Sequence, residues 1–315
     1  MVVALLAGGT GSAKLAAGLR DILLDPRFAS GPGGELNVIA NTGDDIEIYD
    51  AHVSPDPDLI TFRLAGVIDE RGFGVKGETH DEMDRRRAHG EDIWFELGDD
   101  DLAVCRARSD ALAGGATLTA AHEQATAAYD TRGARVLPMS NDPVRTVVRT
   151  PAGPRGLQQF LIQDRSEPAI EEVLFGGAAT AAPTNEVLDA IARADLVVIG
   201  PSNPVISIGP ILAMPRLRDA LAAAAAPVLA VSPFVGGEVL KGPTAKFLSA
   251  SGVTADSSGV AAHLRARYGE IVDAMIADDP VAGLPHHLAG VRMADDDEQR
   301  AVASEVLRYG SSLSR

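Results

Sequence analysis

The sequence predicts an α/β protein with a Rossmann-like, doubly wound, mostly parallel sheet, a helical insert and a β-hairpin extension. At the start, an apolar run from Val2 to Ala7 stops at a glycine-rich turn, and a helix-like pattern follows from Leu15 to Leu24. This is the order strand, turn, helix. From Thr184 onwards, helices and strands alternate again, which is typical of a doubly wound fold.

The first turn, residues 8–14, reads Gly-Gly-Thr-Gly-Ser-Ala-Lys. Gly8, Gly9 and Gly11 allow a tight turn that brings bare N–H groups against a phosphate, and the helix start adds its positive dipole end. The spacing is neither that of a P-loop nor the full dinucleotide fingerprint, because Lys14 stands where the last glycine of that fingerprint would be. The turn predicts a phosphate ester or nucleotide ligand. The alternative is a β-to-α turn that only needs positive φ angles.

Charge and composition limit the classes of partner. With 28 basic and 44 acidic residues the formal charge is −16, which disfavours nucleic acids and anionic membranes. No apolar run approaches about 20 residues and no basic region precedes Val2, so we expect neither a membrane span nor a secretory signal, and a cytoplasmic location. The single cysteine, Cys105, excludes an intramolecular disulfide and is expected to be a buried thiol.

An acidic protein that binds phosphate must neutralise charge locally, with a few cations or with a divalent metal. The strand predicted at Leu36 to Ala40 is followed by Asn41-Thr42-Gly43-Asp44-Asp45, and Ser54-Pro55-Asp56-Pro57-Asp58 comes shortly after. We expect both segments to be loops beyond strands, where ligands of parallel sheets bind. Asp44 and Asp58 are therefore candidate Mg²⁺ ligands or a general base, and the alternative is helix caps and Asx turns.

The chain is expected to form a single catalytic domain over residues 1–315. Its core would comprise residues 1–65 and 133–315, and residues 66–132 would form a helical insert or lid, with helices near Glu78 to His89 and Thr119 to Ala128. This insert holds the only tryptophan, Trp94. The Trp94-Phe95 pair can stack on a planar ring, but taken alone it is better interpreted as a core anchor.

The rest of the chain is expected to supply further strands, helices and ligand loops. Arg145 to Thr150 and Leu157 to Asp164 are predicted to form a hairpin around residues 151–154. Serine and asparagine in the loops after two later strands suit a phosphate or a nucleobase edge, unless they are simple turn formers. The remaining expected elements are a strand at Arg135 to Pro138, a helix at Thr184 to Ala194, a strand at Leu196 to Gly200, a helix around Gly209 to Ala225, a strand at Val228 to Val231 and a helix after Gly242. The loops are Gly200-Pro201-Ser202-Asn203-Pro204 and Ser232-Pro233-Phe234-Val235-Gly236-Gly237.

Six motifs, in this order, give the chain a resemblance that covers nearly its whole length. They are Gly8-Gly9-Thr10-Gly11, Asn41-Thr42-Gly43-Asp44-Asp45, Ser54-Pro55-Asp56-Pro57-Asp58, Trp94-Phe95-Glu96-Leu97-Gly98-Asp99, Gly200-Pro201-Ser202-Asn203-Pro204 with Ser207-Ile208-Gly209-Pro210, and Ser232-Pro233 with Gly236-Gly237. In this order the motifs resemble the 2-phospho-L-lactate transferase family of coenzyme F-420 biosynthesis.

The resemblance implies transfer of a phospho-organic acid, such as 2-phospholactate or phosphoenolpyruvate, from a guanosine diphosphate conjugate to the terminal hydroxyl of the deazaflavin Fo. GMP would be released, Mg²⁺ would be required, and coenzyme F-420-0 or its dehydro form would result. By the same resemblance, Asp44 and Asp58 would hold Mg²⁺ and orient the hydroxyl, one of them accepting its proton. Asp58, Trp94 and Glu96 would border the deazaflavin, and the guanosine diphosphate part would be held by Gly8, Gly9, Thr10, Gly11, Lys14, Ser202, Asn203 and Ser232. Asn41 would be a further ligand-binding residue.

The chain departs from the family where an arginine usually follows Leu97-Gly98-Asp99, because Asp100 stands there. A charge that would meet the substrate acid or a phosphate is therefore missing or supplied elsewhere, and the donated acid stays open. The alternative from another class is a non-catalytic nucleotide-sugar-binding regulator of the same fold. We expect a homodimer, the commonest assembly of soluble enzymes.

Overall fold

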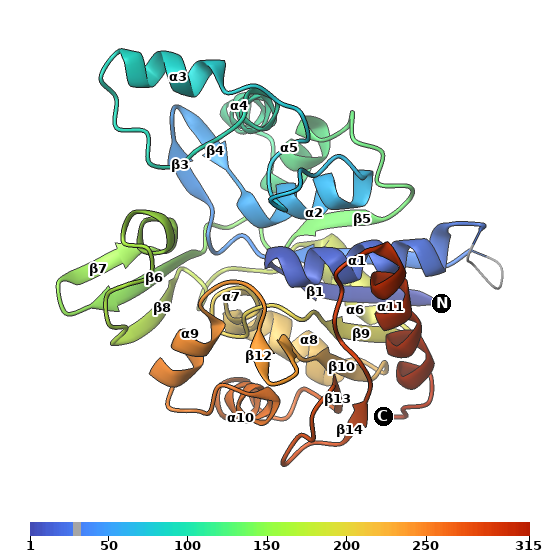
Figure 1. Ribbon diagram of the computed structural model, residues 1–315. Coiled ribbons are helices and arrows are strands. Elements are labelled where there is room, and N and C mark those ends of the chain that lie inside the picture. Colours follow the sequence, from blue (N-terminus) through green and yellow to red (C-terminus); the bar gives the residue numbers. More distant parts are fainter. Residues whose placement is uncertain (28–32) are drawn as a thin grey trace.

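The computed structural model describes residues 1–27 and 33–315, and its centre is a seven-stranded sheet (Figure 1). The strand order is β14-β13-β10-β9-β1-β2-β5, and every neighbouring pair is parallel. The chain therefore runs outward from β1 in both directions, and a ligand crevice is expected outside the carboxyl ends of β1 and β9. The strands are β1 (Val2–Ala7), β2 (Glu35–Ala40), β5 (Arg135–Pro138), β9 (Leu196–Ile199), β10 (Val228–Val231), β13 (Ala274–Ala277) and β14 (His286–Leu288).

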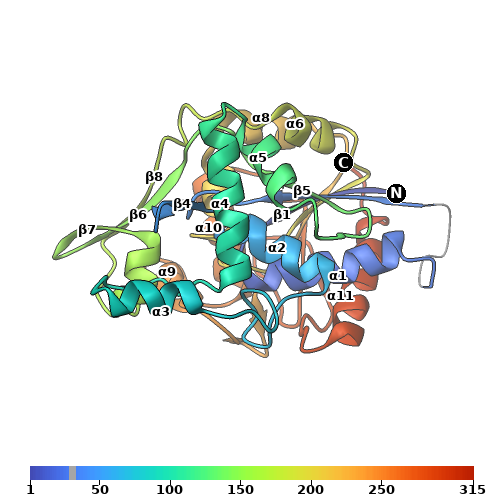
Figure 2. The ribbon, with the colours of Figure 1, turned by 90° about the horizontal axis from the view of Figure 1, so that it is seen from above.

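Helices cover both faces of this sheet, as expected when its strands are apolar on both sides. Helices α1 and α11 pack together on one face, and α6 and α8 pack together on the other (Figure 2). The predicted α/β class is confirmed. These helices are α1 (Gly9–Leu24), α6 (Asn185–Ala192), α8 (Pro215–Ala223) and α11 (Asp296–Gly310). Within the described ranges, no helix is long and apolar enough to cross a membrane.

The segment between β2 and β5 holds a small hairpin, β3 (Ile46–Ile48) with β4 (Ala51–Val53), and four helices. Asp56 and Asp58 were expected in a loop, which is wrong: Pro55 starts helix α2, and both acids lie in its first turn. Pro at the first position and acids in the first turn are signals of a helix start. The four helices are α2 (Pro55–Ala65), α3 (Asp81–Ala88), α4 (Asp99–Ala113) and α5 (Leu118–Ala125). The predicted boundaries of the insert, residues 66–132, stay a prediction.

The expected antiparallel extension is present as a three-stranded sheet in the order β7-β6-β8. Its hairpin is tighter than predicted, because β7 follows β6 after only Pro151 and Ala152. The predicted strand at Leu157 to Asp164 is wrong: this stretch contains the π-helix η1, whose Phe160 is fully buried against Phe247. The strands are β6 (Arg145–Thr150), β7 (Gly153–Gly156) and β8 (Glu172–Gly176), and η1 spans Gln159–Gln163.

The single helix predicted around Gly209 to Ala225 is also two helices. The backbone of Met214 is extended, and Pro215 begins a new helix. Pro disfavours the helical conformation of the residue before it, which explains the break. The remaining elements are α7 (Gly209–Ala213), β11 (Phe234–Val235), β12 (Glu238–Val239), α9 (Thr244–Ala250) and α10 (Ser257–Tyr268).

Candidate active site

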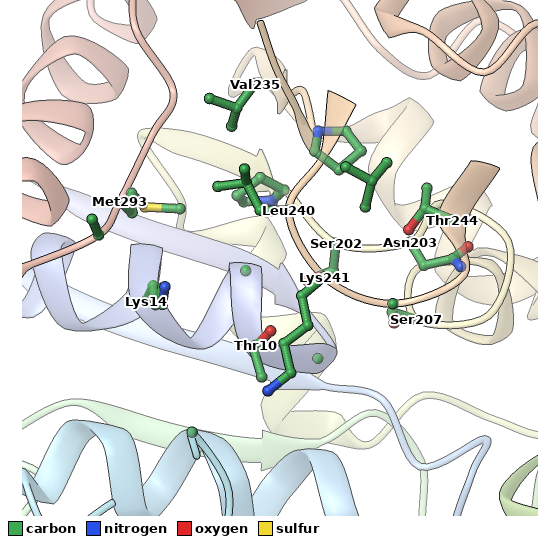
Figure 3. Close-up of a pocket in the computed structure, with 18 of the residues that line it drawn as sticks. Thr10, Lys14, Ser202, Asn203, Ser207, Val235, Leu240, Lys241, Thr244 and Met293 are labelled. Carbon is green, nitrogen blue, oxygen red and sulfur yellow. The ribbon is translucent and has the colours of Figure 1, made fainter. Parts of the chain in front are cut away.

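A pocket of about 600 Å³ opens at the carboxyl ends of β1, β9 and β10 (Figure 3). Its wall is made by the glycine turn at the start of α1, the two loops after β9 and β10, and the start of α11. The sequence-predicted residues that line it are Gly9, Thr10, Gly11, Lys14, Ser202, Asn203 and Ser232.

Close backbone approach fixes the glycine turn. A Cβ atom on Gly11 would lie 2.0 Å from the carbonyl oxygen of Pro201, so only glycine fits there, and Gly9 has a φ of +66°. The Ser202 hydroxyl accepts hydrogen bonds from the amide and hydroxyl of Ser12, at 2.9 and 2.8 Å. The turn after β1 and the loop after β9 are thus joined into one rigid wall.

The pocket wall contains a buried side-chain amide whose nitrogen has no partner in the described part of the chain. The Asn203 side chain is only 8% exposed, and its Oδ1 accepts hydrogen bonds from the amides of Val205 and Ile206. Its Nδ2 is buried without a hydrogen bond. An orphaned donor is costly when it is buried, so this amide is available to an oxygen acceptor of a ligand. Ser232, by contrast, is already bonded to Ser257 at 2.7 Å.

Basic and acidic side chains both line the pocket, the acids being Asp69, Glu70, Asp295 and Asp296. Lys14, Arg63 and Lys241 all line it. Burial, then the charges of Arg63 and Lys241, lower the pKa of Lys14 from its ordinary value. Three cations that repel one another form a site that a bound diphosphate would stabilise.

Beside the pocket, Asn41 holds two carboxylates together. Its Nδ2 donates to Asp44 at 3.1 Å and to Asp56 at 2.9 Å, while Asp56 also accepts the amide of Gly9 at 2.6 Å. Burial, then the charges of Asp56 and Asp45, raise the pKa of Asp44 well above its ordinary range. Burial also raises the pKa of Asp56 to about 6, against the hydrogen bonds of Asn41 and Gly9. Asp56 therefore joins the glycine turn to the acids.

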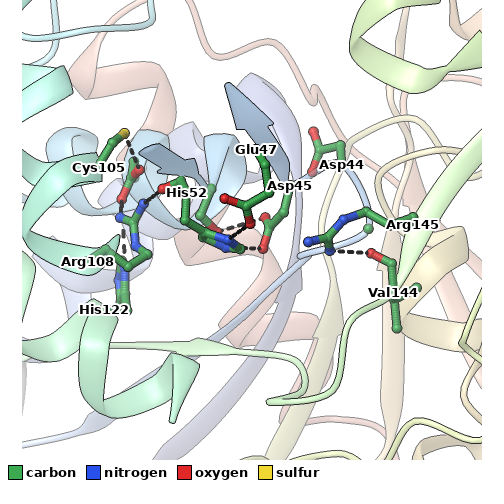
Figure 4. Close-up of polar contacts among 12 residues, drawn as sticks. Asp44, Asp45, Glu47, His52, Cys105, Arg108, His122, Val144 and Arg145 are labelled. Carbon is green, nitrogen blue, oxygen red and sulfur yellow. Dashed lines mark hydrogen bonds and ion pairs between the residues drawn. The ribbon is translucent and has the colours of Figure 1, made fainter. Parts of the chain in front are cut away.

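The third acid of this group, Asp45, is already compensated. It accepts hydrogen bonds from Ser54 Oγ at 2.8 Å and from His52 Nε2 at 3.1 Å (Figure 4). Burial lowers the pKa of His52, but its hydrogen bonds and ion pairs with Asp45 and Glu47 outweigh this effect and raise the pKa overall. We refer to Asn41, Asp44, Asp45, His52 and Asp56 as the acid cluster.

Asp58, the second acid assigned from the sequence, faces another way. It forms a buried ion pair with Arg108 of α4, a residue with no exposed surface. Arg108 Nη1 also donates to the His52 carbonyl at 3.0 Å, and His122 Nδ1 lies 3.7 Å from Asp58. The structure thus groups Asp44 with Asp56, while the predicted role of Asp58 toward a metal stays a prediction. Arg108 was missed because its partner lies 50 residues earlier in the chain.

Trp94 and Glu96 lie in the insert and not among the described lining residues of the pocket. Trp94 packs edge-on against Phe95, with ring centroids 5.8 Å apart, in a small core that also contains Met83. This agrees with the core-anchor interpretation. The Glu96 carboxylate pairs with Arg87 at 2.8 Å. Their predicted contact with a deazaflavin stays a prediction.

Comparison with known proteins decides the family. Residues 2–303 match the family model described as 2-phospho-L-lactate transferase CofD. The chain belongs to this family. It is 36% identical to a phosphoenolpyruvate transferase of Streptomyces griseus, with 99% of each chain covered. It is 35% identical to a 2-phospho-L-lactate transferase of Methanospirillum hungatei, with 98% of each covered.

Solved structures support the fold alone. A Bacillus halodurans protein of the UPF0052 family superposes with a TM-score of 0.59 at 18% identity, covering 96% of this chain and 90% of that one. As a member of the 2-phospho-L-lactate transferase CofD family, the protein is a transferase of the kind associated with coenzyme F-420 biosynthesis. Relatives with nearly the same identity carry two different names, so the family does not name the acid that is transferred.

The family's transferase chemistry requires charge control at phosphate, and two carboxylate groups are placed to provide it. Asp44 and Asp56 offer hard oxygen ligands that repel each other, which a divalent cation would relieve. The other group comprises Asp58, Asp101 and Cys105, whose ligand atoms lie within 4.8 Å of one another. Arg108 already compensates Asp58, and burial raises the pKa of the Cys105 thiol. The donors of Asp44 and Asp56 therefore fit Mg²⁺ better.

Proposed function

We propose that the protein transfers a phospho-organic acid from a guanosine diphosphate conjugate to the terminal hydroxyl of the deazaflavin Fo. The observation that carries this proposal is the double contact of Asp56, with the Gly9 amide of the phosphate turn and with Asn41 of the acid cluster. A diphosphate on the turn would lie next to carboxylates, and the repulsion between these negative groups would weaken binding of the diphosphate alone. The same carboxylates are suited to holding a cation and an attacking hydroxyl at phosphorus.

In the proposed reaction the hydroxyl oxygen of Fo attacks the phosphorus that carries the organic acid. A new P–O bond forms, the bond between the two phosphates breaks, and GMP leaves with the electron pair. The proton of the hydroxyl passes to a carboxylate beside the reacting phosphate. Positioning of the two substrates supplies most of the rate.

The chain's residues would divide the work along the crevice. Lys14 and the turn amides would hold the diphosphate, and the free Nδ2 of Asn203 would donate to an oxygen of the nucleotide. Asp44 and Asp56 would hold Mg²⁺, which would neutralise the charge that develops on the phosphates. The deazaflavin contacts of Trp94 and Glu96 belong to the same proposal and rest on the sequence resemblance. A homodimer and a cytoplasmic location are also proposed, on the general sequence arguments given above.

The direct test incubates the purified protein with Fo, Mg²⁺ and, in parallel, the lactyl, enolpyruvyl and glyceryl diphosphoguanosine donors. GMP and the deazaflavin product are followed by mass. We expect product from one donor, loss of product with a chelator, and recovery with added Mg²⁺. If no donor reacts and Fo fluorescence is unchanged by the protein, the proposal fails.

Two substitutions then assign the acids. Asp44→Asn removes a charge at the reacting phosphate and should lower kcat by about 10²–10³-fold. Asp110→Asn, on the exposed side of α4, is the control and should react normally. Near-normal transfer by Asp58→Asn, with unaltered Mg²⁺ dependence, would remove Asp58 from the chemistry, whereas near-normal transfer by Asp44→Asn would contradict the assignment made here.

A further inference from the structure

One cation beside the acid cluster has no acidic partner. Arg145 begins strand β6 and is partly exposed, and its Nη1 donates only to the neighbouring Val144 carbonyl, at 2.8 Å. Among the residues that the structure describes, no carboxylate lies within ion-pair distance of it. A guanidinium carries five N–H donors, so most of its hydrogen-bonding capacity is unused.

The backbone holds Arg145 at the acid cluster. The amide of Thr146 donates to the Gly43 carbonyl at 2.5 Å, which ties the start of β6 to the turn that carries Asp44. Across the small sheet, Arg145 is in register with Gly176, which has no side chain to pair with it. Figure 4 shows the guanidinium directed to the side of Asp44 and Asp45.

The two oxygens of Asp44 are occupied by neutral donors rather than by Arg145. Asn41 Nδ2 donates to Oδ1 and Gln158 Nε2 donates to Oδ2, each at 3.1 Å. The arginine charge acts on Asp44 without a bond to it. Arg145 is therefore fixed close to the reaction site with its N–H groups free for a ligand.

Another arginine of the same strand shows the contrast. Arg149 lies four residues further along β6 and pairs with Glu172 of β8 at 3.3 Å. It is an ordinary surface ion pair, with both partners about half exposed. The two arginines share a strand and a charge but differ in position, one beside the acids and one away from them.

The groups along the crevice follow a fixed order: the Gly9 amide, Asp56, Asn41, Asp44 and then Arg145. A donor with its diphosphate on the glycine turn would present its parts in the same order, ending at the organic acid beyond the transferred phosphate. Arginine is the side chain best shaped for a carboxylate, because it can donate two parallel hydrogen bonds. In a protein of charge −16, a second anion next to three acids requires such a local cation.

We propose that Arg145 binds the carboxylate of the transferred acid and makes the enzyme select donors that carry one. The inference rests on the proposed function, and it adds the chemical group that the site recognises and the residue that recognises it.

The test compares two donors on wild type and variants: lactyl diphosphoguanosine and the analogue in which its carboxylate is a carboxamide. We expect the wild type to bind and use the carboxylate donor better. Arg145→Met should lower kcat/KM and affinity for the carboxylate donor by about 30–100-fold, and those for the carboxamide by less than about 3-fold. Arg145→Lys should fall between, since it keeps the charge but not the paired geometry.

Matched measurements separate the possible failures. Arg149→Met should behave as wild type with both donors, and GDP affinity measured by calorimetry should be unchanged in Arg145→Met. Equal losses on both donors, or no loss on either, overturn the role of Arg145. If the wild type transfers neither group to Fo, the proposed function fails, whereas the binding comparison between the two donors still decides whether Arg145 recognises a carboxylate.

Discussion

The pocket at the carboxyl ends of β1, β9 and β10 adjoins the acid cluster, yet the two regions are held together by different groups. The pocket wall depends on backbone: Gly11 lets Pro201 approach, and small hydroxyl side chains join the two loops. The acid cluster depends on side chains from three segments, the loop after β2, strand β4 and helix α2. His52 compensates Asp45 within it, and Arg108 compensates the neighbouring Asp58. The first is a rigid surface for a ligand. The second is an electrostatic balance that substitution of one member would upset.

The two regions also differ in which charged side chains lack an ion pair. Along the pocket, Lys14, Arg63 and Lys241 have no ion pair among the described residues, so an anion would stabilise them, although acids also line the pocket. In the acid cluster, Asp44 and Asp56 accept hydrogen bonds but form no ion pair among the described residues, so a bound cation would stabilise them. A ligand that carries both a diphosphate and a bound metal would satisfy the two regions together.

Arg108→Met should have the largest effect on stability, because it leaves the buried Asp58 charge without its partner. We expect the free energy of unfolding to fall by about 3–5 kcal/mol. Urea denaturation measures it, and Arg106→Met, on the exposed side of the same helix, should cost less than about 1 kcal/mol. Adding Asp58→Asn to Arg108→Met should recover part of the loss, since the two residues are coupled. Strictly additive losses would show that Asp58 and Arg108 are not energetically coupled.

The comparison also explains what could be predicted from sequence. The structure brings the glycine turn and the loops after β9 and β10 together at one pocket, because parallel strands bring their carboxyl ends to one edge whatever the side chains. The pairing of Asp44 with Asp56 could not be predicted, since it depends on a helix beginning at Pro55. Likewise, Arg108 and Arg145 reach the acids only through tertiary structure. Their spacing in the sequence carries no periodic signal.

Gly11→Ala tests the backbone side of the comparison. The new Cβ would overlap the Pro201 carbonyl, so the turn and the loop must separate. We expect a loss of about 1–3 kcal/mol in stability and at least about 10-fold weaker GDP binding, measured by calorimetry, if the wall has to be rigid. Gly290→Ala is the control, because a Cβ there meets nothing within 4 Å and should change neither quantity. Wild-type affinity in Gly11→Ala would mean that the wall need not be rigid.

The smallest effect concerns pH and His52. Burial works against protonation, but its contacts with Asp45 and Glu47 raise the pKa of the folded state above the unfolded value of 6.5. Between these two pKa values the folded protein holds more protons than the unfolded chain. His52 therefore contributes stability that is fully present below pH 6.5 and is lost as the pH rises through the folded-state pKa. The decline can be no steeper than about 1.4 kcal/mol per pH unit for one proton.

The variant His52→Gln isolates this contribution, because glutamine can donate to Asp45 but does not titrate. The difference in unfolding free energy between wild type and His52→Gln, measured by urea denaturation from pH 6 to 9, should shrink as the pH rises. A constant difference would mean that His52 serves Asp45 only as a neutral hydrogen-bond donor. The acid cluster would then resemble the pocket wall, held by geometry and not by charge.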